Sequence, residues 1–153
     1  MFSLFRKKRD NFFSAEEKEK ILSAIQNAEQ TTSGEIRVYV ENRCRFVDAI
    51  DRAAEVFYSL KMNQTAYRNA TLVYVAVKDK QAAIFGDQGI HQKVGDQYWE
   101  SEVMKMLQRF KHEQLAEGIS LAVTDLGQAL QHYFPYNKDT DKNELPDEIV
   151  FGR

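Results

Sequence analysis

The sequence has almost no cysteine and no long apolar run, and each shortage excludes a class of protein. Cys44 is the only cysteine, so neither an internal disulfide nor a zinc site built from several thiolates can form. No segment approaches the roughly 20 consecutive apolar residues of a membrane-spanning helix, since even Leu72 to Val77 has only the length of a strand. The basic residues 6–9 are followed by no apolar stretch of signal-peptide length, so we expect a cytoplasmic protein.

Charge of one sign is also lacking. The formal net charge is -2, with 21 Lys and Arg against 23 Asp and Glu, so no general field attracts nucleic acid or anionic lipid. A charged partner would have to be recognised locally. The 153 residues, 43% of them hydrophobic, suit one domain with one core. We expect a flexible basic N-terminus over residues 1–13, a domain over residues 14–136, and an acidic, partly mobile tail over residues 137–153.

The spacing of apolar residues predicts the secondary structure. Ser14 and Glu17 have the spacing of a capping box and begin a helix that ends before residues 31–34. Alternation over residues 36–40 predicts a strand, helical spacing over residues 50–60 a helix, and the apolar run 71–77 a buried central strand. A short turn leads into an antiparallel strand over residues 82–85. Helices over residues 99–110 and 119–133 follow, the first preceded by a helical turn over residues 90–94.

This order predicts an α/β fold: a three-layer α/β/α sandwich with a small mixed sheet of three or four strands, flanked by about four helices. The first two strands, joined by a helix, should be parallel with a right-handed crossover, and the third should be antiparallel to the second. Glu35 begins the first strand and Asp87 follows the third. Both carboxylates should therefore lie near the same edge of the sheet.

The run from Phe85 to Ile90 carries the strongest candidate site. It places Asp87 between Gly86 and Gly89 at the end of a strand, where glycines permit a sharp turn. Hard cations prefer several oxygen ligands from loops and strand ends, so we predict Glu35, Asp79 and Asp87 as metal ligands. Two plainer interpretations stay open: Glu35 as a solvent-facing strand residue and Asp79 as a turn former.

Other side chains are secondary candidates. Asp48 and Asp96 lie near helix starts, where an acid usually caps the helix. Trp99 lies on an apolar helical stripe and belongs to the core, and it would also wall a pocket if its helix packs beside Asp87. Arg37 and Arg68 either contact an anionic substrate or lie at the solvated surface.

Three segments together resemble the TPM domain family, over about residues 14–134. The segments are Thr32 to Val38, Asn69 to Val77 leading into Asp79, and Gly86 to Ile90 with Trp99. The resemblance implies the three-layer sandwich, calcium bound at acidic loops, and the acid phosphatase activity associated with a plant member. The family pattern places two adjacent aspartates before the first helix, where this chain has only Asp10.

Three functions follow as hypotheses. The first is a binding or regulatory module that holds a divalent cation, calcium above all, at the edge containing Glu35 and Asp87. The second is a metal-assisted phosphatase using the same acids, for which the spacing supplies neither a nucleophile nor a leaving-group acid. The third is a metal-free protein-interaction domain, whose tail over residues 143–151 folds onto a protein partner or back onto the domain.

Overall fold

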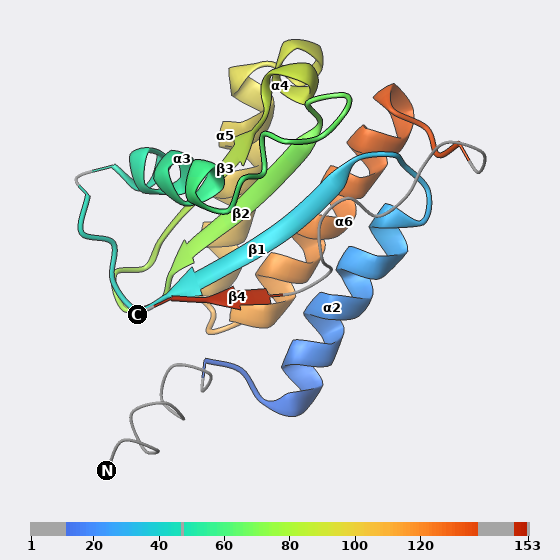
Figure 1. Cartoon of the computed structure of the whole chain (residues 1–153). Helices are drawn as coiled ribbons and strands as arrows, with labels where there is room; N and C mark the ends of the chain where they lie inside the picture. The colour runs from blue at the N-terminus through green and yellow to red at the C-terminus, as the bar shows by residue number, and fades with distance from the viewer. Residues whose placement is uncertain (1–11, 47, 138–148, 153) are drawn as a thin grey trace.

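A computed structural model describes residues 12–46, 48–137 and 149–152 (Figure 1). Four strands form one sheet in the order β3-β2-β1-β4, in which β1 is parallel to β2 and β4, and β3 is antiparallel to β2. The elements are α2 (Ala15–Glu29), β1 (Glu35–Glu41), α3 (Ala49–Ser59), β2 (Ala70–Ala76), β3 (Gln81–Gly86), α4 (Gln88–Val94), α5 (Asp96–Phe110), α6 (Leu115–Tyr133) and β4 (Ile149–Phe151).

Helices cover both faces of the sheet, which confirms the predicted three-layer α/β/α sandwich. On one face, α2, α5 and α6 pack against side chains such as Val38, Val73 and Ile84. On the other face, α3 packs against Leu72 and Tyr74. Every residue of β2 is buried, as its continuous apolar run predicts, because helices cover both of its faces.

The first described helix begins where the capping box predicts. The amide of Glu17 donates to Ser14 Oγ, and the amide of Ser14 donates to the Glu17 carboxylate, so each residue satisfies a free amide of the other. The same helix approaches α6 closely. A Cβ at Gly127 would lie 2.6 Å from Cβ of Ala28, so a larger residue at this position would push the two helices apart.

Two elements differ from the pattern-based prediction. The expected helical turn over residues 90–94 is a longer helix, α4, so the described residues contain five helices rather than four. A fourth strand, β4, pairs in parallel with Val38 to Val40, and its Phe151 ring stacks on Phe12 with the centroids 6.0 Å apart. Three residues are too few to display an alternating pattern. Residues 1–11 of the expected flexible N-terminus, including Asp10, and residues 138–148 and 153 of the expected tail lie outside the described residues.

One carboxylate is buried where α5 meets α6. Glu102 is only 3% exposed, and its Oε2 accepts a hydrogen bond of 3.0 Å from Lys105 Nζ. Burial, together with a hydrogen bond to Asp125, raises the pKa of Glu102 to about 7, against the opposing effect of Lys105. Since this pKa exceeds the ordinary value of 4.5, the folded protein binds more protons than the unfolded chain between these two pH values.

The free energy of unfolding should therefore decrease as the pH rises from 4.5 to about 7. Glu102→Gln should flatten this slope and make the protein more stable than the wild type above pH 7. Urea denaturation at a series of pH values measures both effects. Glu100→Gln is the matched control, because Glu100 is exposed on the same helix and should leave the slope unchanged. An unchanged slope in Glu102→Gln would contradict the assignment.

Candidate functional site

Two glycines shape the turn that carries Asp87 from β3 into α4. A Cβ at Gly86 would lie 2.3 Å from the Trp99 ring, and a Cβ at Gly89 would lie 2.3 Å from the carbonyl oxygen of Tyr67. Neither contact could tolerate a side chain. The glycines therefore let the turn pack directly against the indole and against the backbone that leads into β2.

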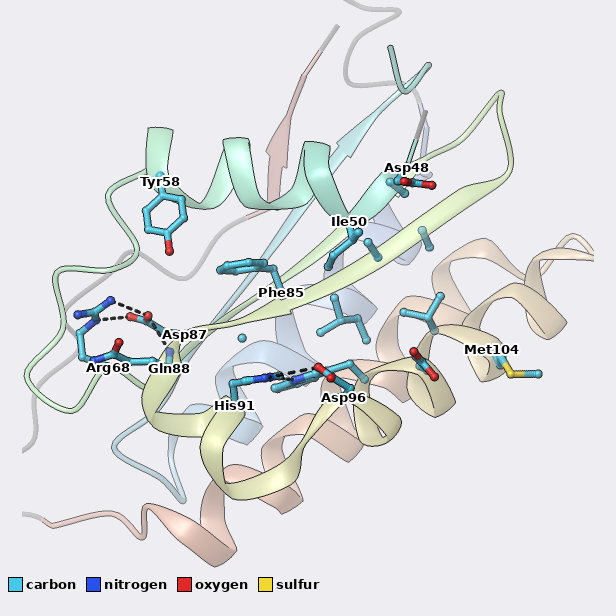
Figure 2. A pocket seen from close by; sticks show the side chains of 18 residues that line it. Asp48, Ile50, Tyr58, Arg68, Phe85, Asp87, Gln88, His91, Asp96 and Met104 are labelled. Atoms are coloured by element: carbon cyan, nitrogen blue, oxygen red, sulfur yellow. Dashed lines mark hydrogen bonds and ion pairs between the residues drawn. The ribbon is translucent and has the colours of Figure 1, made fainter. Parts of the chain in front are cut away.

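Asp87 forms a double hydrogen bond with Arg68. Arg68 Nε donates to Oδ2 at 2.7 Å and Arg68 Nη2 donates to Oδ1 at 2.9 Å, as Figure 2 shows. Oδ1 also accepts from the amide of Gln88 at 2.8 Å, so Asp87 caps α4. The pairing with Asp87 raises the pKa of Arg68. Because Asp87 is only 2% exposed, its charge is neutralised inside the fold rather than offered to solvent.

A series of polar side-chain contacts begins at Trp99, whose Nε1 donates to Nδ1 of His91 at 2.9 Å. In this arrangement Nδ1 carries no proton, so the neutral imidazole has its hydrogen on Nε2. That nitrogen lies 3.5 Å from Oδ1 of Asp96. Trp99 is 7% exposed, belongs to the core and also lines the adjacent groove, so both roles predicted for it hold.

A groove of about 830 Å³ runs along β3 between α3 and α5. Its floor is formed by residues 82–86 of β3, and its walls carry apolar side chains that remain exposed (Figure 2). Ile50 and Tyr58 of α3 are 46% and 52% exposed, and Met104 of α5 is 70% exposed. Arg68 and Asp87 close one end, where β3 meets α4.

The three predicted metal ligands do not converge. Glu35 pairs in register with Ala70, and the amide of Asp87 donates to the Ala70 carbonyl, so Glu35 and Asp87 lie at the same end of the sheet as expected. Glu35 is 2% exposed, so it is not the solvent-facing residue of the plainer interpretation. Asp79 follows β2 at the opposite end, where it accepts from the amide of Cys44 at 2.7 Å.

The hydrogen bonds of Asp87 bear directly on calcium binding. Both oxygens of Asp87 already accept hydrogen bonds from Arg68, so a cation would have to displace the guanidinium to reach them. Among the described residues, no group of three or more histidine, cysteine, aspartate or glutamate side chains is placed to hold a metal ion. The donor set as it stands does not fit calcium, whose ligands are usually six to eight oxygens. Calcium binding stays a prediction.

The opposite end of the sheet holds a polar cluster that the sequence analysis missed. Arg52 of α3 donates to both oxygens of Glu41, at 2.9 Å each, and the Tyr74 hydroxyl donates to the same carboxylate. Burial and the hydrogen bond to Glu41 raise the pKa of Tyr74, and the bond to Glu41 raises that of Arg52. The alternating polar residues of β1 were the available signal, but they do not reveal that Arg52 faces them.

The remaining candidates also have definite positions. Asp48 is the N-cap residue of α3 without a side-chain capping bond, and Asp96 lies in the first turn of α5; both line the groove. Arg37 is 6% exposed, so it is not a solvated surface residue. Arg68 forms an ion pair with Asp87. None of the described helices is both long and apolar enough to cross a membrane.

Comparisons with known proteins place this fold. A family model described as the TPM domain matches residues 7–129. The chain belongs to the TPM domain family. Its fold matches the NMR structure of BA42 from the psychrophilic bacterium Bizionia argentinensis, with a TM-score of 0.83 and 42% identity, over 92% of this chain and 95% of that one.

A more distant TPM-like fold is the N-terminal domain of cg2496 from Corynebacterium glutamicum. The TM-score is 0.59 at 16% identity, over 78% of this chain and 74% of that chain, so this likeness supports the fold alone. A comparison with curated proteins found no match. The sequence resemblance to the TPM family is therefore confirmed by the family model and by the structural neighbours.

The pair formed by Arg68 and Asp87 should stabilise this TPM domain. Asp87→Ala removes the cap of α4 and leaves the guanidinium without its carboxylate, so the free energy of unfolding should fall by about 2 kcal/mol. Asp87→Asn keeps an oxygen that can accept from the Gln88 amide and should cost less. Urea denaturation of the three proteins measures the order. Equal stability of Asp87→Ala and the wild type would show that the pair has no structural role.

Proposed function

We propose that this TPM domain is a binding module that holds a polypeptide in the groove between α3 and α5. The observation that carries the proposal is the exposure of large apolar side chains on both walls of one groove. Ile50, Tyr58 and Met104 each expose about half or more of their surface there. Exposed apolar residues that gather around a concavity, rather than scatter singly, are typical of interaction sites.

The residues that line the groove suit binding better than catalysis. Among the described lining residues there is no serine, threonine or cysteine that could act as a nucleophile. Arg68 and Asp87 form an ion pair with each other, so each already has a partner within the fold. His91 is held by Trp99 on one side. These side chains form a rigid polar end wall beside an apolar groove, an arrangement that orients a bound chain without acting on it.

A calcium site remains a second candidate, because Glu35 and Asp87 do lie at the same end of the sheet. Calcium at this end would require Arg68 to swing away from Asp87 and the ion to take further oxygens from backbone or water. The metal-assisted phosphatase depends on the same displacement, since its cation would occupy the same place. Both alternatives can therefore be tested together.

A display library of random octapeptides tests the polypeptide proposal. Selection on the immobilised domain should enrich peptides whose binding is lost in Met104→Lys, because this change places a charge in the apolar wall. Leu121→Lys is the matched control. Leu121 is 40% exposed on α6 and does not line the groove, so this variant should bind the peptides as the wild type does.

Two results would overturn the polypeptide proposal. One is the absence of any peptide enriched above the bare support. The other is equal binding by Met104→Lys and Leu121→Lys, which would place the peptide outside the groove. Both variants change an exposed side chain, so both should keep the wild-type fold, and a thermal melt verifies this before the comparison.

A calcium titration of ¹⁵N-labelled protein tests the second candidate, with magnesium for comparison. A cation at this end predicts saturable amide shifts over residues 34–36 and 86–89, together with a shift of the Arg68 side-chain NεH as it leaves Asp87. Arg68→Gln should strengthen such binding, because it removes the competing guanidinium. The absence of saturable shifts at millimolar calcium would remove the calcium and phosphatase alternatives and leave the polypeptide proposal untouched.

A further inference from the structure

The floor of the groove is the free edge of a strand. β3 is the last strand on its side of the sheet, and among the described residues no strand pairs with its outer edge. The amide of Asp87 donates to the Ala70 carbonyl, which makes positions 87 and 70 a hydrogen-bonded pair of the antiparallel ladder. Since such pairs alternate, residues 85, 83 and 81 also bond to β2. The backbone groups of Ala82, Ile84 and Gly86 therefore point outward into the groove.

The residues of this edge strand do not themselves block pairing. Natural edge strands are blocked by charged side chains, proline or a bulge. The strand Gln81–Gly86 contains no charged residue and no proline, and it pairs with β2 in continuous register. Its side chains are small or turned into the two cores, with Ala83 and Ile84 only 4% and 1% exposed. An extended chain could approach the backbone without meeting a side chain in the plane of the sheet.

The walls of the groove face the positions that side chains of an added strand would occupy. Residues of a strand point alternately to the two faces of its sheet. One set would meet Ile50 and Tyr58 of α3, and the other would meet Met104 of α5 (Figure 2). Trp99 of α5 also lines the groove. Both walls are apolar near the strand. The groove thus matches a chain that buries apolar side chains on both faces while its backbone pairs with β3.

Charge identifies the partner more closely. Three exposed carboxylates line the groove, those of Asp48, Asp96 and Glu100, whereas the guanidinium of Arg68, which also lines it, is neutralised by Asp87. A partner with basic side chains would complement this potential. A second copy of the chain is disfavoured, because pairing two β3 edges would bring two sets of these carboxylates together.

We propose, building on the function given above, that the groove binds an extended segment of a partner protein with basic and apolar side chains, and that this segment adds to the sheet as a strand antiparallel or parallel to β3. Main-chain hydrogen bonds to Ala82, Ile84 and Gly86 supply affinity. The apolar walls and the three carboxylates supply selectivity. The polar end wall at Arg68 and Asp87 limits how far the segment extends.

The probe is a fluorescein-labelled peptide, Gly-Lys-Val-Val-Arg-Val-Val-Gly, which as a strand places valines and one basic side chain on each face, and its binding is followed by fluorescence polarisation. Two further peptides carry N-methyl groups on alternate residues, one on the odd and one on the even positions. A strand added to β3 uses only one set of amides, so one methylated series should lose at least about tenfold in affinity and the other should bind within about twofold of the parent. A peptide with Glu and Asp in place of Lys and Arg should not bind.

Three variants of the full chain locate the contact. Ala82→Pro removes an amide that points into the groove without removing a ladder bond to β2, so it should abolish binding at a preserved fold. If this variant fails to fold, Glu100→Lys provides a second test of binding in the groove. It should weaken binding at least about tenfold at low salt, because it reverses one groove charge. Glu19→Lys, exposed on α2 outside the groove, should bind as the wild type.

The outcomes separate this inference from the broader function. No saturable polarisation change up to ~1 mM basic peptide overturns the inference. Equal loss of affinity in both methylated series, or in neither, excludes strand addition. A different result is that library peptides still require Met104 for binding and yet lack basic residues, or keep their affinity when N-methylated. In that case the groove binds polypeptides in another manner, and only the proposed function stands. Binding that produces dimers of the domain instead of a one-to-one complex would identify a second copy as the occupant.

Discussion

The double hydrogen bond between Arg68 and Asp87 fixes the end of the sheet on which the groove depends. Arg68 lies two residues before β2 in a left-handed conformation, with a φ of 52°, and its carbonyl accepts from the amide of Gly89. Asp87 bonds back to Ala70 through its own amide. Side chain and backbone together clamp the entry to β2 against the exit from β3. The direction in which α4 leaves the sheet follows from this clamp.

The orientation of α4 in turn determines one wall of the groove. His91 lies on α4 and accepts from Trp99, which anchors α5 against the turn. The Trp99 ring occupies the space over Gly86 that any side chain would fill. Arg68 and Asp87 are 19 residues apart in the sequence. Their ion pair therefore sets the position of α5, a helix to which neither residue belongs. A close-packed interior has low compressibility and therefore transmits such a constraint.

Local chemistry explains which parts of the fold the sequence could predict. The capping box at Ser14 and Glu17, the alternation in β1 and the continuous apolar run of β2 are all readable within a few residues. The unusual turn at Gly86 was also predictable, but its physical reason was not. A Cβ at Gly86 would lie 2.3 Å from the ring of Trp99, an indole 13 residues later in the chain, and this close approach accounts for the glycine. A glycine reports close approach without identifying what approaches.

Distant pairings explain the rest. Nothing near Asp87 in the sequence indicates that Arg68 is its partner. Likewise, nothing near Asp79 indicates that β3 separates it from Asp87 and places the two carboxylates at opposite ends of the sheet. Strand β4, with three residues, gives no periodic signal. The groove itself arises from two helices that flank one strand edge, a relation that appears only once register and crossover are known.

The two edges of the sheet have different surroundings, and this difference bears on which strand can bind to the β3 edge. On the β1 side, β4 occupies the edge over Val38 to Val40. On the β3 side, α3 and α5 stand on either side of a bare backbone. Helices in this position would obstruct a second, broad sheet while leaving space for one strand. An edge recessed in this way is protected against aggregation by its walls instead of by charged strand residues. The same walls then decide which single strand can enter, so protection and recognition rest on one geometry.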